Sequence, residues 1–168
     1  YIEQVLCIKS NLRVLEIGCR EGGNLKPFLD VGCHCVGIDI DVAQVEKAKA
    51  FFANHSLNKN LRLIANDIYK VSPNEIGNFD LIILRDVIEH LPNQELFMHQ
   101  LKCFMHSESV VFFGFPVWCN PFGGHQQICR SKWLSHTPWL HLLPKRLYKK
   151  VLQFGGESTA TIKALLDI

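Results

Sequence analysis

Several features are scarce or missing in this 168-residue sequence, and each absence narrows the class of protein. No apolar run reaches the roughly 18 residues that a membrane-spanning helix requires, and no basic stretch followed by an apolar one opens the chain. The net charge is only +2, which by itself does not indicate a nucleic-acid-binding protein. Apolar residues make up 48% of the chain and charged residues 20%, a composition typical of a folded globular domain.

Paired-cysteine motifs are also missing. The chain has seven cysteines but no CxxC pair, and Cys33-His34-Cys35 is the only close cluster. On a strand these two thiols would point to one face, yet no second pair follows at the spacing of a zinc site. We therefore expect no metal site and buried or free thiols. Reduced thiols also favour a cytoplasmic location.

The sequence does contain a regular alternation of short apolar runs and amphipathic segments. Most of the runs are continuously apolar, which is typical of parallel strands covered on both faces. The predicted strands span residues 12–17, 34–40, 61–65, 79–84 and 109–115. The predicted helices span residues 1–11, 24–31, 42–55, 93–105 and 158–167. This alternation predicts an α/β domain with a doubly wound, mainly parallel sheet in three layers.

Acidic residues lie at the ends of the first three predicted strands. Glu16 precedes the turn residue Gly18, Asp39 ends the second strand 21 residues after Gly18, and Asp67 follows the third. Ligands of open α/β sheets bind beyond these carboxyl ends. A carboxylate about 20 residues past a glycine turn accepts hydrogen bonds from a ribose diol, and Asp67 could accept one from an exocyclic amine such as that of adenine. Alternatively, Asp39 could cap the next helix and Asp67 could be a turn residue.

Four stretches at these strand ends together resemble the class I S-adenosylmethionine-dependent methyltransferases. They are Glu16-Ile17-Gly18-Cys19-Arg20-Glu21-Gly22, Gly37-Ile38-Asp39-Ile40, Asn66-Asp67-Ile68 and the stretch from Phe79 to Leu91. They occur in order and at suitable spacing within residues 12–116. The first stretch departs from the family pattern, because Arg20 stands where a middle glycine is usual. We expect the Arg20 side chain to point to solvent or to the cofactor carboxylate.

The resemblance implies a sheet of order 3-2-1-4-5 and S-adenosylmethionine as the cofactor. Gly18 and Gly22 would let the backbone approach the methionine part of the cofactor. Glu16 would accept a hydrogen bond from its amino group or orient the loop through water. Arg85 and Asp86 would lie near the methionine end and the transferred methyl.

The resemblance also assigns the nucleoside part of the cofactor. Asp39 would bind the ribose hydroxyls and Asp67 the adenine amine, with Ile40 and Ile68 against the ring. The complete set of predicted cofactor-binding residues is Glu16, Gly18, Cys19, Arg20, Gly22, Asp39, Ile40, Asn66, Asp67, Ile68, Arg85 and Asp86.

The expected reaction is an in-line displacement, for which the enzyme supplies position and electrostatics. A small-molecule, glycan or lipid-linked acceptor is expected, methylated on oxygen or nitrogen. Only an unactivated acceptor group needs a general base, and the candidates are His90 and His125. The alternatives are a non-catalytic relative that binds S-adenosylmethionine, and less favourably an RNA methyltransferase or an NAD-type oxidoreductase, whose GxGxxG turn is missing here.

The segment after the fifth predicted strand breaks the strand–helix rhythm. Residues 1–168 are expected to form one domain, in which residues 12–116 bind the cofactor and residues 117–154 form a lid on the acceptor side. Residues 132–152 combine tryptophan and leucine with lysine and arginine. This mixture is typical of a helix at a membrane interface, of a lid or of a dimer contact with a solvated basic face. RNA is disfavoured because the basic cluster is short.

Members of the resembled family usually have two further strands, which form an antiparallel hairpin. No such strand pair is evident in residues 151–168. We therefore expect the natural protein to continue beyond Ile168.

Overall fold

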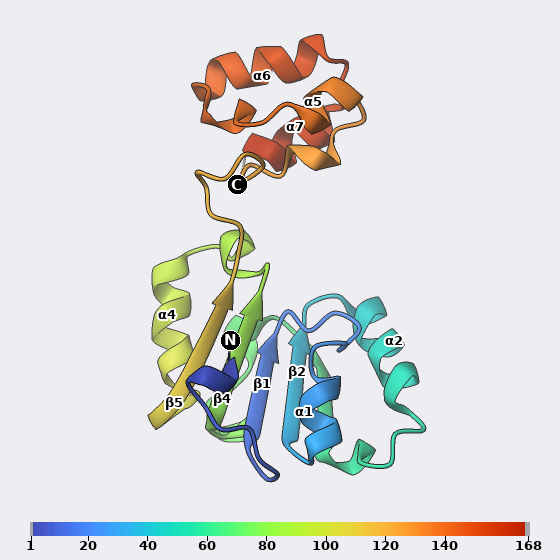
Figure 1. Cartoon of the computed structure of the whole chain (residues 1–168), viewed down its shortest axis with the longest axis vertical. Coiled ribbons are helices and arrows are strands. Elements are labelled where there is room, and N and C mark those ends of the chain that lie inside the picture. The colour runs from blue at the N-terminus through green and yellow to red at the C-terminus, as the bar shows by residue number, and fades with distance from the viewer. Residues whose placement is uncertain (1, 167–168) are drawn as a thin grey trace. The chain divides into compact units, whose positions relative to one another are not determined.

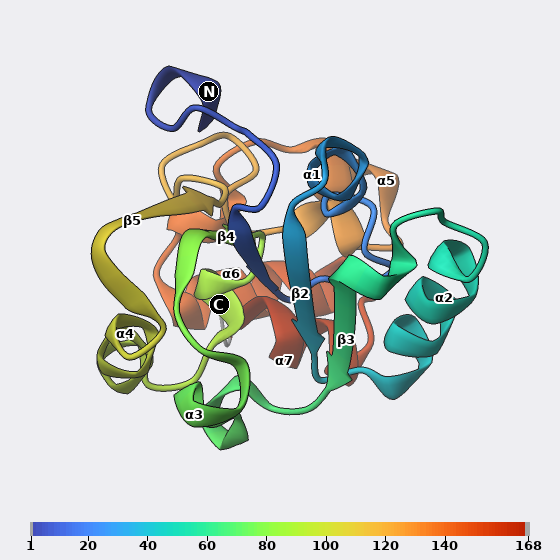
Figure 2. The same cartoon turned by 90° about the horizontal axis from the view of Figure 1, so that it is seen from below.

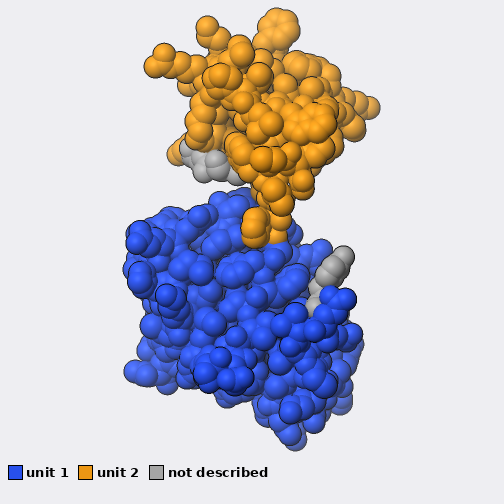
Figure 3. All heavy atoms as spheres, turned by 60° about the vertical axis from the view of Figure 1, so that its left-hand side comes forward, with its two compact units in different colours: residues 1–114 blue, residues 115–168 orange. Residues whose placement is uncertain are grey.

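The structure is a computed structural model that describes residues 2–166. The chain divides into two compact units, residues 1–114 and residues 115–168 (Figure 3). This boundary lies close to the predicted division between residues 12–116 and 117–154. The assignment of the second segment as a lid stays a prediction.

The first unit contains a parallel five-stranded sheet (Figure 1). Its strands are β1 (Arg13–Ile17), β2 (His34–Asp39), β3 (Leu61–Ala65), β4 (Phe79–Arg85) and β5 (Met105–Gly114). The order is β3-β2-β1-β4-β5, and every neighbouring pair is parallel. These observations confirm the predicted fold class and strand order. Residues 2–166 contain no further strand, so β5 is an edge of the described sheet.

Helices cover both faces of this sheet (Figure 2). They are α1 (Lys26–Val31), α2 (Val42–Phe52), α3 (Pro73–Ile76) and α4 (Gln94–Lys102). Successive strand residues point to opposite faces, so β1 supplies both layers of the core. Val14 packs with α1 and α2, whereas Leu15 and Ile17 pack with α3 and α4. The expected three-layer arrangement is therefore present.

Local signals explain where the helices begin and end. The Asp41 side chain accepts hydrogen bonds from the backbone N–H groups of Ala43 (2.9 Å) and Gln44 (3.4 Å), which caps α2. Asn93 caps α4 in the same way. Helix α1 ends at Gly32, whose φ of +94° is in the left-handed region that favours glycine.

The structure corrects two of the predicted elements most clearly. Only Ile2–Gln4 forms a short 3-10 turn where a helix over residues 1–11 was expected. Apolar side chains of the N-terminal segment still pack on the core, among them Ile2, Leu6 and Ile8. A helix this short has little stability of its own. Strand β5 begins at Met105 rather than at residue 109, because Met105 pairs with Phe79 before an irregularity in the register.

All regular secondary structure in the described residues of the second unit is helical. After the 3-10 turn Gln126–Ile128 come α5 (Lys132–His136), the 3-10 turn Leu140–Leu142, α6 (Lys145–Phe154) and α7 (Thr159–Leu166). Helix α7 confirms the helix predicted over residues 158–167 as far as the described residues extend. Its small core consists of Cys129, Leu134, Tyr148, Leu152, Ile162 and Leu165. No helix within residues 2–166 has both the length and the apolar character to cross a membrane.

The loop of residues 116–127 is held by bonds within this second unit. The backbone N–H of Trp139 donates to the Pro121 carbonyl (2.6 Å), and the ring Nε2 of His141 lies 2.6 Å from the Trp118 carbonyl. Gly124 packs so closely on His141 that a Cβ would lie 2.1 Å from the histidine Cβ. Glycine is therefore needed at this position for steric reasons.

Candidate functional site

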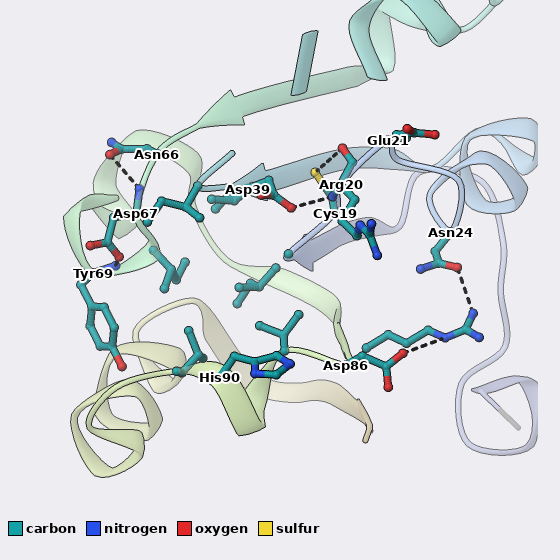
Figure 4. A pocket seen from close by; sticks show the side chains of 18 of the residues that line it. Cys19, Arg20, Glu21, Asn24, Asp39, Asn66, Asp67, Tyr69, Asp86 and His90 are labelled. Carbon is teal, nitrogen blue, oxygen red and sulfur yellow. Dashed lines mark hydrogen bonds and ion pairs between the residues drawn. The ribbon is translucent and has the colours of Figure 1, made fainter. Parts of the chain in front are cut away.

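A cavity of about 740 Å³ lies at the carboxyl ends of β1 to β4 in the first unit (Figure 4). Ten of the twelve predicted cofactor-binding residues line it; the exceptions are Glu16 and Gly22. His90 also lines the cavity, whereas His125 belongs to the second unit and does not. Side chains at the ends of four separate strands therefore meet at one cavity, as expected for the carboxyl edge of an open α/β sheet.

Asp39 is fixed at the end of β2 by two backbone hydrogen bonds. Its Oδ2 accepts from the Arg20 N–H (2.7 Å) and its Oδ1 from the Asp41 N–H (2.9 Å). Only 8% of the residue is exposed. Each oxygen keeps a further lone pair, so the carboxylate can still accept hydrogen bonds from a ligand. The alternative that Asp39 caps α2 is wrong, because Asp41 does so.

The turn after β1 explains why Arg20 can replace a glycine. Arg20 has φ of +47°, a left-handed conformation that glycine adopts without strain. Its side chain is exposed, and its N–H bonds to Asp39. The cavity beside it stays open. Arg20 therefore preserves the path of the loop at a modest cost in backbone strain.

The two glycines of this turn have different surroundings. Gly18 lines the cavity with φ of +75°, and a Cβ there would lie 2.3 Å from Cγ2 of Val87. Gly22 also has positive φ, but a Cβ would meet the Phe52 ring at 2.8 Å. Gly22 thus faces helix α2. Gly22 does not line the cavity, and its predicted approach to the ligand stays a prediction.

The end of β3 supplies a second carboxylate. Asp67 Oδ1 accepts from the Tyr69 N–H (3.1 Å), and the Asn66 side chain accepts from the Asp67 N–H (2.9 Å). Asp67 therefore has the turn role considered above, while its Oδ2 remains available to a ligand. Nearby, Ile40 is 73% exposed at the cavity, whereas Ile68 is buried. An exposed isoleucine beside two carboxylates suits the face of a heterocyclic ring.

Glu16 lies beneath the cavity rather than in its wall. Only 1% of it is exposed, its Oε1 accepts from the Asn24 side chain (2.7 Å), and its buried Oε2 has no partner. Burial raises the pKa of Glu16 to about 7, while the Asn24 hydrogen bond and the Arg85 charge act in the opposite direction. Asn24 links Glu16 to Arg85, whose Nη1 donates to the Asn24 Oδ1 (3.3 Å).

The end of β4 forms the remaining wall. Arg85 and Asp86 lie side by side, with 3.9 Å between Nε and Oδ2, and Asp86 has φ of +53°. The 3-10 turn Ile88–His90 follows and brings His90 to the cavity. The end of β4 therefore places a guanidinium, a carboxylate and an imidazole at the opening of the cavity.

Sequence reasoning missed several lining residues. Asn24 and Tyr69 are examples: Asn24 connects Glu16 to Arg85, and the Tyr69 hydroxyl donates to the backbone carbonyls of Pro92 and Asn93. Tyr69 follows directly after the Asn66-Asp67-Ile68 stretch, which was an available signal. Asn24 lies in the turn before α1, where no sequence pattern marks it.

The described residues contain no group of three or more histidine, cysteine, aspartate or glutamate side chains that could hold a metal ion. All seven cysteines are unpaired, and burial raises the pKa of the Cys19 and Cys35 thiols to about 12. Cys19 lines the cavity. Its high pKa disfavours the thiolate, so Cys19 is poorly suited to act as a nucleophile.

Comparison with known proteins agrees with this geometry. The family model of a methyltransferase domain matches residues 2–154. Similar curated relatives include the ubiquinone biosynthesis O-methyltransferases of Bartonella tribocorum (25% identical, covering 67% of this chain and 49% of the relative) and Brucella melitensis (26%, 67% and 48%). The chain therefore spans about half the length of the curated relatives it matches.

Solved structures with the same fold include coclaurine N-methyltransferase bound to N-methylheliamine and SAH (TM-score 0.59, 21% identical, 67% of this chain and 33% of that chain). A Thiobacillus denitrificans methyltransferase in complex with S-adenosyl-L-homocysteine has a TM-score of 0.57 at 18% identity, covering 67% and 45%. The [4+2]-cyclase SpnF reaches 0.59 at 15% identity, covering 67% and 41%. Taken with the match to the family model, the chain belongs to the class I S-adenosylmethionine-dependent methyltransferase family.

Proposed function

We propose that the first unit binds S-adenosylmethionine in the cavity and that the protein transfers its methyl group to a small-molecule acceptor. One observation carries this proposal: Asp39 and Asp67, from the ends of two neighbouring strands, line the same cavity as Gly18. Each carboxylate is positioned by backbone N–H groups and retains capacity to accept further hydrogen bonds. A ligand with a ribose diol and an aromatic amine would satisfy both.

The nucleoside would occupy the side of the cavity formed by β2 and β3. Asp39 would accept from the two ribose hydroxyls and Asp67 from the adenine amine. Ile40 would lie against the ring, with the buried Ile68 behind it. The Asn66 side chain already bonds the Asp67 N–H and would keep that carboxylate in place.

The methionine part would occupy the side formed by the ends of β1 and β4. Gly18 would allow close backbone approach, and Cys19 and Arg20 would continue this wall. Arg85 would pair with the ligand carboxylate. Glu16 would act from beneath through Asn24, because it does not reach the cavity wall itself.

When bound, the cofactor supplies a methyl group activated by a sulfonium. The residues of the chain position the acceptor and exclude water from the cavity mouth. An acceptor hydroxyl or ammonium must also lose a proton, and His90 at the mouth is the first candidate to accept it. His125 is the second candidate, with residues 117–154 as the proposed acceptor-side lid.

The relatives support a small-molecule acceptor, methylated on oxygen or nitrogen. Their names specify an O-methyltransferase of ubiquinone biosynthesis and a coclaurine N-methyltransferase. A glycan or another lipid-linked molecule fits the same reaction class. The seven unpaired thiols support a cytoplasmic location.

Calorimetric titration with S-adenosylmethionine, S-adenosylhomocysteine and NAD tests the binding step. We expect both sulfur compounds to bind and NAD not to bind. Asp39→Ala should weaken binding by about 10- to 100-fold, since it removes charge-assisted hydrogen bonds. Asp41→Ala is the matched control, because Asp41 caps α2 and does not line the cavity. Equal affinities for Asp39→Ala and the unmodified protein would rule out the proposed ribose site.

Transfer of labelled methyl to a panel of phenols, amines, glycans and prenylated phenols tests the second step. Binding of the cofactor without methyl transfer to any of these acceptors favours the non-catalytic alternative. The cyclase SpnF has the same fold, so the fold alone does not fix the reaction. His90→Ala and His90→Gln should reduce the rate most for hydroxyl acceptors at low pH. A reduction that is equal at all pH values would contradict the role of a base.

A further inference from the structure

The two units carry net charges of opposite sign. Residues 1–114 contain eleven lysines and arginines against fourteen aspartates and glutamates, whereas residues 115–168 contain seven against two. Of those two acids, the structure describes Glu157. Its carboxylate is buried and accepts from the backbone N–H groups of Arg130 (3.2 Å) and Ser131 (2.9 Å). Within residues 115–166, the surface cations therefore have no exposed acid to pair with.

Helix α6 carries three of these cations on its exposed surface. Its buried residues, Tyr148 and Leu152, are four apart and face the core of the second unit. Because residues advance by about 100° in a helix, Arg146 and Lys150 lie on the side opposite these two residues, and Lys149 lies on the flank between the two sides. All three are exposed, and none forms an ion pair among the described residues. Like charges three and four residues apart repel one another, so a polyanion bound there would be stabilising.

An apolar edge runs beside this cationic strip. Leu147 and Phe154 are seven residues apart, two helical turns, and so lie on the same side of α6, next to Lys150. Phe154 is 91% exposed and Leu147 47% exposed. A surface helix with three cations bordered by two exposed apolar side chains is typical of peptides that lie in the headgroup layer of a bilayer.

We propose that α6 docks onto an anionic lipid bilayer, lying in the plane of the membrane surface. Arg146, Lys149 and Lys150 contact lipid phosphates, and Phe154 and Leu147 enter the boundary between headgroups and acyl chains. Trp133 and Trp139, each 50% exposed in the same unit, are of the residue type enriched at this boundary. The inference does not depend on methyl transfer.

Lipid fits this surface better than nucleic acid does. Single-stranded nucleic acid is held by aromatic rings that stack on bases along a cationic groove. The cationic side of α6 is instead bordered by an aliphatic leucine and by one phenylalanine at the end of the helix. Residues 1–114 carry a net negative charge, so they do not extend the cationic surface into the long basic groove that a nucleic-acid strand would follow.

Vesicle binding of the 168-residue chain tests the proposal. All three tryptophans lie in residues 115–168, so intrinsic tryptophan fluorescence reports on this unit alone. We expect a blue shift and co-sedimentation with vesicles of equal phosphatidylglycerol and phosphatidylcholine, reversed by high salt, and no binding to pure phosphatidylcholine. Equal binding to both vesicle types, or binding to neither, would overturn the proposal.

Two sets of variants separate the electrostatic and apolar contributions. Arg146→Gln/Lys149→Gln/Lys150→Gln should weaken binding to the anionic vesicles by about a hundredfold, on the usual scale for cations at a charged membrane surface. Leu147→Gln/Phe154→Gln should reduce the blue shift while preserving the salt dependence. The matched control removes three exposed cations of the first unit: Lys9→Gln/Lys59→Gln/Lys102→Gln. A control that loses binding to the same extent overturns the assignment to α6.

Four further measurements complete the test. Unchanged S-adenosylmethionine affinity and unchanged near-ultraviolet circular dichroism show that the triple variant is folded; if it is not, each cation is replaced singly. Single-stranded RNA that binds more tightly than the vesicles, and is lost in the same variants, overturns the proposal in favour of nucleic acid. Salt-sensitive dimerisation without vesicle binding, measured by light scattering, overturns it in favour of a second copy of this chain.

Discussion

The two units use their buried polar side chains in different ways. In residues 1–114 the buried acids Glu16 and Asp39 lie at the carboxyl edge of the sheet and organise a cavity. In residues 115–168, Gln126 donates to the carbonyls of Pro121 (3.0 Å) and Thr137 (3.1 Å), and Glu157 accepts from two backbone N–H groups. There the buried polar groups hold irregular backbone in place, whereas Asp39 both holds the turn after β1 and lines the cavity.

Charge follows the same division. The unit with the cavity is net negative and carries carboxylates at its ligand edge, whereas the helical unit is basic and exposes aromatic side chains. The difference underlies our two proposals: a compact ligand with hydroxyl and amine donors for the first unit, and an extended anionic surface for the second.

The largest expected contrast concerns glycines with the same backbone conformation in different surroundings. Gly18→Ala should destabilise the first unit by about 3–4 kcal/mol, because left-handed strain adds to overpacking against Val87. Gly156→Ala in the second unit has similar φ (+78°) but nothing within 4 Å, and should cost only about 1 kcal/mol. Urea unfolding measures both, and equal losses would show that packing at Gly18 adds nothing.

The next contrast uses pH. Burial raises the pKa of Glu16 from 4.5 to about 7, so the folded chain binds more protons than the unfolded chain between these values. The contribution of Glu16 to stability is therefore fully present below pH 4.5 and is lost as pH rises through 7. Glu16→Gln does not titrate, so it should gain about 2–3 kcal/mol relative to the unmodified protein between pH 5 and pH 8. Parallel stability curves for the two proteins would contradict this.

Glu157 provides the corresponding test in the second unit. Glu157→Ala leaves the Arg130 and Ser131 N–H groups without their acceptor and should cost about 2 kcal/mol, detected by tryptophan fluorescence during unfolding. Glu157→Gln keeps one acceptor oxygen and should cost less. S-adenosylmethionine affinity should be unchanged in both variants. A loss of affinity would mean that the two units are energetically coupled.

The smallest expected effect is at Phe154. This side chain is 91% exposed, so Phe154→Gln should change the free energy of unfolding by less than about 0.5 kcal/mol. A markedly larger loss, measured by urea unfolding, would show that Phe154 packs within the protein in solution and is unavailable to a membrane.

The sequence by itself determined the fold class and most of the predicted residues that line the cavity of the first unit. Continuous apolar strands alternating with helices require a covered parallel sheet, and that topology gathers the strand-end residues Gly18, Asp39, Asp67, Arg85 and His90 at one edge. The prediction succeeded because it needed only local pattern and the direction of the strands.

Only the tertiary structure decided which strand-end residues face the cavity and which face the core. Gly22 packs against Phe52, and Glu16 is buried with its carboxylate bonded to Asn24. The cap of α2 is Asp41 rather than Asp39. The tertiary structure also left Arg146, Lys149 and Lys150 exposed on α6 without an acidic partner among the described residues. These outcomes depend on contacts between segments far apart in the chain, which local periodicity and spacing do not encode.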